Sequence, residues 1–310
     1  MSAATTLSRR ALIGGGLAAL VQPGAPARAE GLRAAAIDWA LLETLLGMGL
    51  TPVAATELVL FRQVAVEPPV PASVVDIGLR GALNYEALRL TRPSVIFSSN
   101  FYAGMESQLA RIAPVETISI YRTGRPPYDE AEAAATRIGA LTGKEEAARS
   151  LIASVAGEIA ACRHRLAGET GRPLLVLNLG DARHFRVFGA DSLFGEVLAR
   201  LGFANAWGER TFYSASAPIG IEALARFPEA FLVVLRPVPP DAARVLGTSA
   251  LWNALPQIRA RRLAVLASVD PFGGLPTAAR FARLLTGALL NPDSGARAGE
   301  LAGKAGGDIG

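Results

Sequence analysis

Few residues of this 310-residue chain stand in a pattern that could carry out catalysis. Ser214 and Ser216 lack the flanking glycines of a G-x-S-x-G nucleophile turn. The segment 139–144 (GALTGK) is one residue short of a phosphate-binding loop and follows a helical pattern instead of a strand. We interpret it as a helix stop followed by a second helix. Because no nucleophile with its base and no cofactor loop is visible, we expect no enzyme.

Metal and thiol chemistry are also disfavoured. The two histidines, His164 and His184, have no neighbours at metal-ligand spacing, so we expect no site for a bare metal ion and no cofactor. Cys162 is the single cysteine, so the chain cannot form an internal disulfide. Its position in a helical stretch predicts a buried or half-buried thiol without a chemical role.

The first 29 residues have the composition of an export leader. Arg9 and Arg10 precede an apolar run over 11–21, and Ala27-Arg28-Ala29 has the small-x-small pattern of a cleavage site. The paired arginines are typical of twin-arginine leaders. An apolar run of 11 residues is too short to cross a bilayer, which needs about 20. We therefore expect export to the periplasm, with cleavage near Ala29.

The predicted leader also accounts for the basic charge. It carries three of the 31 basic residues and none of the 27 acidic ones, so its removal lowers the net charge from +4 to +1 (28 basic against 27 acidic residues). A chain of nearly balanced charge offers no electrostatic support for nucleic-acid binding. We expect no nucleic-acid partner.

After the leader, short apolar runs alternate with amphipathic helical patterns, which predicts α/β layers. The pattern divides into an N-terminal lobe over 30–143 and a C-terminal lobe over 170–290, and the Gly- and Ala-rich tail 291–310 is expected to be disordered. The predicted strands are 34–37, 74–77, 95–98, 117–120, 174–179, 184–188, 231–235 and 263–266, and the predicted helices are 41–48, 85–90, 108–112, 193–201, 221–227 and 275–290.

A long helical pattern lies between the two lobes. Residues 144–169 contain no proline and repeat apolar side chains at helical spacing. A helix of this length would extend roughly 36 Å. A single helical connection resists wide hinge closure, so we expect only small movements between the lobes.

Seven short strings, in their order and spacing, resemble the periplasmic ferric hydroxamate (ferrichrome-type) siderophore-binding proteins of ABC importers. The resemblance covers nearly all of the chain from Arg33 to about Leu290. It implies two α/β lobes joined by a single long helix, with a shallow cleft that binds an iron chelate and not free iron. It further implies a monomeric receptor that delivers the chelate to an inner-membrane ABC permease. The strings are 37–46, 67–71, 75–80, 109–114, 187–194, 205–207 and 251–256.

The resemblance assigns two ligand-binding residues to the first lobe. Arg80 would donate hydrogen bonds to the hydroxamate oxygens around the iron, since a guanidinium offers several fixed donors. Tyr102 would supply a second contact through its ring and hydroxyl. The alternatives are a surface ion pair for Arg80 and simple packing for Tyr102. Gly78 to Gly81 is predicted as a strand-to-loop exit, where ligands of open α/β sheets usually bind.

The second lobe departs from the family pattern. Where such proteins present tryptophans to the ligand, this chain has Tyr213 and Phe272, which we expect to form the wall of the cleft. Asp270 places a carboxylate where an indole is expected. It would either face the cleft, favouring a chelate with a cationic arm or with a polar, less ring-like shape, or cap the loop before Pro271. Trp39 would line the cleft or, as we favour, fill the core.

Two acidic residues are candidates for docking on the permease. Receptors of this class dock through one acidic residue on each lobe, and Glu106 and Glu222 have suitable loop-to-helix positions. A carboxylate at a helix start is also favourable for the helix dipole alone.

The sequence leaves two rival functions open. One is a receptor of the same fold for another siderophore class, vitamin B12 or haem, and the other is an exported siderophore hydrolase or reductase.

Overall fold

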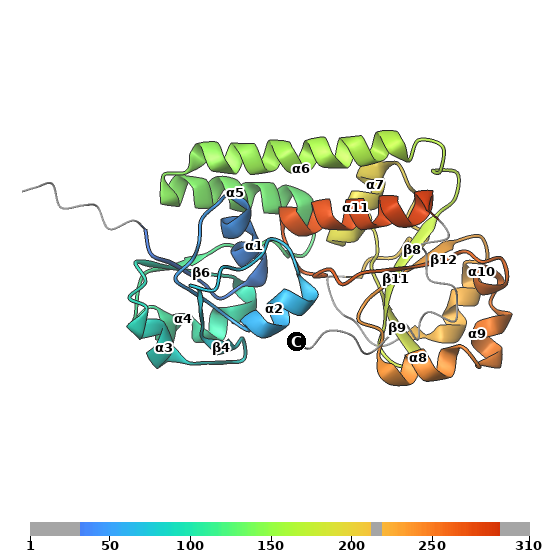
Figure 1. Ribbon diagram of the computed structural model, residues 1–310, viewed down its shortest axis with the longest axis horizontal. Coiled ribbons are helices and arrows are strands. Elements are labelled where there is room, and N and C mark those ends of the chain that lie inside the picture. The colour runs from blue at the N-terminus through green and yellow to red at the C-terminus, as the bar shows by residue number, and fades with distance from the viewer. Residues whose placement is uncertain (1–31, 212–218, 292–310) are drawn as a thin grey trace, which may run out of the picture. The chain divides into compact units, whose positions relative to one another are not determined.

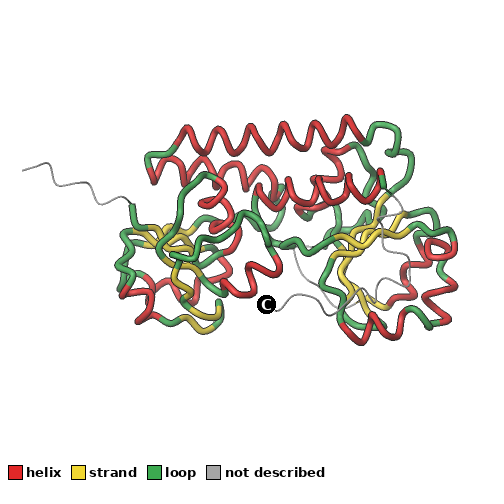
Figure 2. Tube along the Cα trace, in the orientation of Figure 1, coloured by secondary structure: helices red, strands yellow, loops and turns green. Residues whose placement is uncertain are grey.

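The first lobe is built on a parallel sheet whose strand order reverses at its centre. The computed structural model describes residues 32–211 and 219–291 (Figures 1 and 2). In this part of the chain the sheet has the order β3-β2-β1-β6-β7, and all neighbours are parallel. The loops after β1 and β6 leave a topological switch point, where α/β sheets bind ligands. The strands are β1 Ala34–Ala36, β2 Ala54–Ala55, β3 Val75–Asp76, β6 Val95–Ser98 and β7 Val115–Thr117.

Small elements surround this sheet. An antiparallel hairpin follows β3, and Arg80 and Gly81 form its tip. Gly78 starts the hairpin at φ +84°, a left-handed conformation that glycine adopts without steric cost. The elements are β4 Gly78–Leu79, β5 Ala82–Leu83, α2 Leu58–Val64, α3 Tyr85–Leu90, the 3₁₀ segment η1 Asn100–Met105 and α4 Glu106–Leu109.

The second lobe has a mixed sheet of order β10-β9-β8-β11-β12. Its strands β8, β11 and β12 are parallel, whereas β9 and β10 are added antiparallel. Side chains of β8 alternate between two cores: Leu175 and Leu177 pack towards Trp252, and Leu174 and Val176 pack on the opposite side. The elements are β8 Leu174–Leu179, β9 His184–Val187, β10 Ile219–Gly220, η2 Ile221–Arg226, β11 Phe231–Leu235, α8 Pro240–Leu246, α9 Ala250–Ala254, α10 Pro256–Arg259 and β12 Leu263–Leu266.

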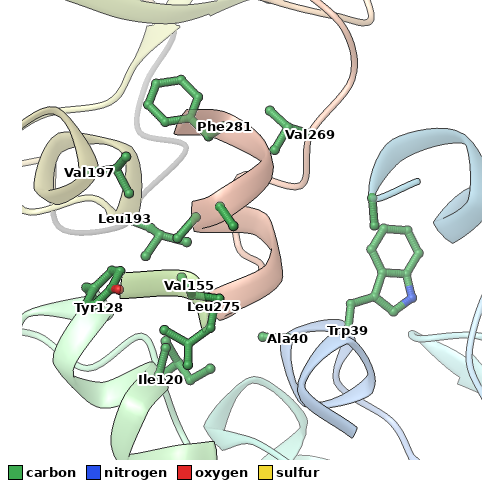
Figure 3. Packing of buried hydrophobic residues seen from close by; sticks show 14 of the residues in the cluster. Trp39, Ala40, Ile120, Tyr128, Val155, Leu193, Val197, Val269, Leu275 and Phe281 are labelled. Atoms are coloured by element: carbon green, nitrogen blue, oxygen red, sulfur yellow. The ribbon is translucent and has the colours of Figure 1, made fainter. Parts of the chain in front are cut away.

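Five helices from both lobes share one hydrophobic core. Figure 3 shows side chains of this cluster from α1, α5, α6, α7 and α11. Gly47 marks the tightest junction, because a Cβ there would lie 3.1 Å from a Leu151 methyl carbon and 3.2 Å from Pro276. The helices are α1 Trp39–Gly47, α5 Pro127–Thr142, α6 Glu145–Arg165, α7 Leu193–Leu201 and α11 Leu275–Leu290.

Helix α6 is the predicted connecting helix, and its sequence accounts for its length. Glu145 and Glu146 lie in its first turn and three basic residues in its last, a distribution that favours the helix macrodipole. Its buried side chains recur at spacings of three and four, which places them on one face. Cys162 is one of them, so the prediction of a buried thiol is confirmed. Helix α6 packs along both α5 and α11 (Figure 1), so the rod is supported over its length.

Several predicted elements differ from the structure. The strand expected at 117–120 is wrong: β7 covers Val115–Thr117, and Ile120 is apolar because it packs into the helical core. The helix expected at 221–227 is a 3₁₀ segment. Helix α5 was expected only as the helical pattern before the stop at 139–144, without bounds. Gly143 ends α5 in the left-handed conformation just before α6, which confirms the predicted helix stop at 139–144. None of the described helices is long and apolar enough to cross a bilayer.

A buried carboxylate ties α1 to the start of α11. The Glu43 side chain is fully buried and accepts hydrogen bonds from the Gly274 backbone N–H at 2.9 Å and from the Thr277 hydroxyl at 2.8 Å. Gly274 is the N-cap of α11, so Glu43 satisfies an N–H that the helix itself leaves without a partner. One residue earlier, the Tyr121 hydroxyl donates to the Gly273 carbonyl at 2.6 Å. The first lobe therefore holds the loop that begins α11.

Ion pairs extend the same junction. Glu67 of the first lobe accepts from Arg280, at 2.7 Å, and from Arg283 of α11, and Arg283 also donates to Glu158 of α6 at 2.6 Å. These contacts oppose separation of α11 from the first lobe. They support the prediction of small lobe movements.

Removing the Glu43 carboxylate should destabilise the fold without touching the surface. In Glu43→Ala the Gly274 N–H and the Thr277 hydroxyl lose their acceptor and a cavity forms, so we expect a loss of about 2–4 kcal/mol of unfolding free energy. Urea denaturation followed by circular dichroism measures this. Glu146→Ala is the control, because Glu146 is 83% exposed in a surface pair with Arg149 and should cost less than about 0.5 kcal/mol. Equal effects of the two substitutions would contradict the role of Glu43.

Candidate ligand-binding site

A pocket of about 290 Å³ lies where the switch point of the first sheet meets the β12–α11 loop. Loops after three strands and the tip of the β4–β5 hairpin contribute to it. This is the position at which open α/β sheets bind ligands, at the carboxyl ends of their strands. Its lining residues are Asp38, Trp39, Arg80, Phe101, Tyr102, Asp270 and Phe272.

Asp38 connects the two strands at the switch point. It follows β1 and caps α1, since its Oδ1 accepts from the N–H groups of Ala40 at 2.8 Å and Leu41 at 3.3 Å. Its Oδ2 accepts from the hydroxyl of Ser99, the residue after β6, at 2.7 Å. Burial raises the pKa of Asp38, and these hydrogen bonds oppose the shift. The carboxylate is thus well provided with donors although it is buried.

Arg80 is held in place before any ligand arrives. Its guanidinium carbon lies 3.9 Å from the centre of the Trp39 ring, a cation–π contact. Its Nε donates to Glu57 Oε2 at 2.7 Å, and its backbone N–H donates to Glu57 Oε1 at 3.1 Å. Glu57 has φ +49°, a conformation that costs a non-glycine residue of order 1 kcal/mol. This strained residue therefore positions the guanidinium at the pocket.

Trp39 serves both of the roles considered for it. It is 3% exposed, its ring packs edge-on against Phe61, and its Nε1 donates to the Thr56 carbonyl at 3.0 Å. It therefore belongs to the core, as favoured from the sequence, and it also lines the pocket beneath Arg80.

Tyr102 lies in the 3₁₀ segment after β6 and faces the same pocket. Burial raises the pKa of Tyr102 to about 12, with Asp38 adding to the shift and Arg80 opposing it. The hydroxyl therefore stays protonated at neutral pH and can donate a hydrogen bond. Part of its ring packs on the core behind it, so the packing alternative also holds in part.

Two rings of the lining, Phe101 and Phe272, belong to a cluster of three aromatic residues. Phe101, Tyr121 and Phe272 are in mutual contact, with ring centres 5.3–6.3 Å apart. Phe101 is 54% exposed, an unusual state for a phenylalanine already in an aromatic cluster. The cluster spans the two lobes, since Phe272 follows β12 and the other two rings belong to the first lobe. It offers an apolar surface opposite the polar groups of the pocket.

Only one of the two carboxyl oxygens of Asp270 accepts a hydrogen bond. Its Oδ1 accepts from the Phe272 N–H at 3.0 Å, the loop-capping role considered from the sequence, yet the residue also lines the pocket. Its Oδ2 is buried and has no hydrogen-bond partner, and the residue is 5% exposed. Burial raises the pKa of Asp270 to about 6, opposed by Arg80 among other groups. Burial, and then the charge of Asp270, also raise the pKa of Glu43.

Known proteins match this chain over most of its length. A family profile described as "Periplasmic binding protein" matches residues 35–269. The chain belongs to this family. It is a family of binding proteins, which agrees with the absence of catalytic patterns in the sequence, and it indicates an extracytoplasmic location.

Within the family, the matches agree with the resemblance found in the sequence. The iron(3+)-hydroxamate-binding protein FhuD of Escherichia coli K12 is 32% identical over 257 residues, which are 83% of this chain and 86% of FhuD. The crystal structure of Vibrio cholerae FhuD with bound Fe3+-Desferal has a TM-score of 0.79 at 25% identity, covering 84% of this chain and 98% of that one. The two-lobed family fold is therefore confirmed.

A more distant member matches in fold alone. The petrobactin-binding protein YclQ of Bacillus subtilis has a TM-score of 0.69 at 16% identity, covering 83% of this chain and 91% of that chain.

The pocket draws on both lobes and contains five of the six ligand-binding residues proposed from the sequence. Arg80, Tyr102 and Phe272 line it, as does Asp270, and Trp39 forms its base. Tyr213 lies outside the described residues.

Two pocket residues were missed, Asp38 and Phe101. Each follows a central strand of the first sheet, so the switch-point rule could have found both. Glu106 and Glu222 lie elsewhere, exposed on α4 and η2.

Because one oxygen of Asp270 has no hydrogen-bond partner, removing this carboxyl should raise the free energy of unfolding, and the gain should depend on pH. Since the folded pKa of Asp270 lies near 6 and the ordinary value is 3.8, ionisation costs folding free energy as the pH rises from about 4 to 6 and the cost persists above that. Asp270→Asn should therefore be more stable than the parent by about 2–3 kcal/mol at pH 8, and the gap should close near pH 4. Urea denaturation across this range measures the gap.

Asp129→Asn is the matched control, because Asp129 is exposed in a surface pair with Arg200. It should show no comparable trend with pH. A stability gap for Asp270→Asn that stayed constant from pH 4 to 8 would contradict the assignment.

Proposed function

We propose that this chain binds a ferric siderophore of the hydroxamate class reversibly and delivers it to an ABC importer. The observation that carries the proposal is the preorganised Arg80 over Trp39 in a pocket bordered by the rings of Phe101 and Phe272. The names of two relatives support the ligand class, since FhuD of E. coli is an iron-hydroxamate binder and that of V. cholerae holds Fe3+-Desferal.

The pocket provides the interactions that such a chelate needs. Hydroxamate oxygens gather around the iron and accept hydrogen bonds, which Arg80 and the protonated Tyr102 can donate. The organic arms around this polar centre are largely apolar, and Phe101 and Phe272 can pack against them. We propose Tyr213 as a further member of this wall. The described lining residues would hold the chelate through hydrogen bonds and packing alone, so release would leave it intact.

The charges of the pocket distinguish a hydroxamate ligand from a catecholate ligand. A tris-catecholate iron complex carries three negative charges, whereas a tris-hydroxamate complex has a neutral iron centre. The described lining of the pocket holds two buried carboxyl groups, Asp38 and Asp270, and one guanidinium, that of Arg80, which Glu57 already pairs with. A strongly anionic ligand would be repelled there. This favours the hydroxamate class over catecholates.

The location and the partner follow from the same proposal. The leader expected over residues 1–29, which lies outside the described residues, would export the chain to the periplasm with cleavage near Ala29. There, as a monomer, it would meet the inner-membrane ABC permease. We propose Glu106 and Glu222, both exposed and one on each lobe, as its docking contacts.

A ligand series tests the proposed function directly. Intrinsic tryptophan fluorescence should be quenched by ferric hydroxamates at micromolar or lower concentrations, because Trp39 lines the pocket. A ferric catecholate, cobalamin and haem should bind more weakly or not at all. Arg80→Ala should weaken hydroxamate binding about ten- to hundredfold, since a hydrogen bond to a charged group contributes about 1.5–3 kcal/mol.

Arg149→Ala serves as the control for this series, because Arg149 lies in an exposed pair on α6. It should bind like the parent. A response to cobalamin or a catecholate alone would replace the proposed ligand class, and unchanged binding by Arg80→Ala would remove Arg80 from the site.

The docking proposal has a separate test. The double charge reversal Glu106→Lys and Glu222→Lys should leave chelate binding unchanged, because neither residue lines the pocket. It should abolish chelate uptake by cells that depend on this receptor. The charge reversal Glu146→Lys on α6 is the control and should support normal uptake. Intact uptake with the double variant would exclude these residues as docking contacts.

A further inference from the structure

The unpartnered oxygen of Asp270 is the one feature of the pocket that the binding of a hydroxamate centre does not explain. Hydroxamate oxygens accept hydrogen bonds and so cannot satisfy a carboxylate. A buried acceptor without a donor costs about 1–3 kcal/mol, and more when it is charged. Asp38, by comparison, is equally buried and receives three hydrogen bonds from Ser99, Ala40 and Leu41.

Arg80 does not compensate for this missing partner. Its guanidinium lies over Trp39 and its Nε is engaged by Glu57, with no hydrogen bond to Asp270. The two groups influence each other through the pocket as charges only. The Arg80 side chain is 34% exposed, and that of Glu57, its partner in the ion pair, is 13% exposed. This largely buried pair keeps the guanidinium in the wall of the pocket and away from Asp270.

The charges that face the pocket leave an excess of negative groups. Its described lining contains the carboxyls of Asp38 and Asp270 and the guanidinium of Arg80, with Glu57 behind the last. The segment 212–218 has the sequence FYSASAP and carries no charged side chain. If both lining carboxyls are ionised, the pocket therefore lacks one or two positive charges, which a ligand could supply.

We infer that the preferred ligand is a ferric hydroxamate with a cationic arm, an ammonium or guanidinium group that donates to Asp270 Oδ2. This inference rests on the proposed function and narrows it to a ligand class. The iron centre sits at Arg80 and Tyr102, and the cation reaches the opposite wall beside Phe272. Asp270 is then a specificity-determining residue for one end of the chelate.

Asp270 has an alternative role as a protonated hydrogen-bond donor, and this role gives binding the opposite pH dependence. A protonated Asp270 would donate its hydroxyl hydrogen to an oxygen of the chelate. Binding of neutral chelates would then strengthen on acidification, whereas the pairing of an ammonium with the carboxylate would weaken. Arg80, Tyr102, Asp38 and Glu43 are the other titratable groups near Asp270. The direction of the pH response decides between the two uses.

The test compares two chelates that differ in one charge. Ferric Desferal carries a terminal primary ammonium, and N-acetylation of that amine makes it neutral. The parent protein should bind the ammonium form about ten- to hundredfold more tightly than the acetyl form at pH 7.5, measured by fluorescence quenching or calorimetry. In Asp270→Asn the ratio should fall to within about twofold.

Measuring both chelates with both proteins separates charge from bulk, because a penalty for the larger acetyl group would persist in the variant. Asp129→Asn is the control for a lost carboxylate and should keep the parent ratio. The parent's preference for the ammonium form should also decline between pH 7.5 and pH 5, as Asp270 gains a proton.

The outcomes are distinct. Equal affinity of the parent for both chelates, or tighter binding of the acetyl form at pH 5, would overturn the inference and leave the proposed function standing. An Asp270→Asn variant that lost both chelates equally would assign Asp270 a structural role and also overturn it. Failure of the parent to bind either chelate would overturn the proposed function itself.

Discussion

The capping of α11 by Glu43 is the interaction on which the geometry of the pocket depends. A helix start buried inside a protein needs acceptors for its N–H groups, and here the acceptor comes from α1 of the other lobe. The residues just before that start are Asp270, Phe272 and Gly273. Because Glu43 and Tyr121 hold Gly274 and Gly273, they also set the position of the Asp270 turn relative to the first sheet. One buried contact thus joins the fold to the site.

The same contact supports the expectation that the two lobes share the pocket without closing widely around a ligand. Most of the lining belongs to the first lobe, and the second lobe contributes one turn after β12. That turn is fixed by hydrogen bonds to the first lobe and by the Glu67 ion pairs to α11. A receptor of this kind binds by complementarity that exists in advance, as the Arg80–Trp39–Glu57 arrangement illustrates. Preorganisation of polar groups reduces the entropy that must be lost when the ligand enters.

At Asp270 the arrangement proposed for ligand binding reduces the stability of the fold. A buried carboxyl with one unused oxygen weakens the folded protein, and the surrounding structure tolerates it. Phe101 shows the same opposition on the apolar side, since a ring that is 54% exposed adds little to the core behind it. Both of these departures from efficient packing line the same pocket, where binding of a ligand can recover the free energy.

The sequence by itself determined the two α/β lobes, the connecting helix, the family and several pocket residues. Strands such as 231–235 and helices such as 275–290 were predicted because local periodicity and helix-stop residues decide them. Arg80 and Tyr102 were found through the family resemblance. The bounds of α5 and those of the strand predicted at 117–120 were not, and Ile120 is apolar because it packs into the core shared by helices from both lobes.

Only the tertiary structure decided what the polar residues do. Asp38 and Phe101 enter the pocket because β1 and β6 are neighbours in the sheet, a pairing that sequence spacing does not encode. Glu43 lies in an ordinary helical pattern, and its role as a cap arises from a residue 231 positions away. For Asp270 the sequence offered two roles, and the structure shows that each oxygen has a different environment. Local sequence patterns do not encode contacts between residues distant in the chain. Those contacts decide whether a polar residue only caps a loop or also lines the pocket.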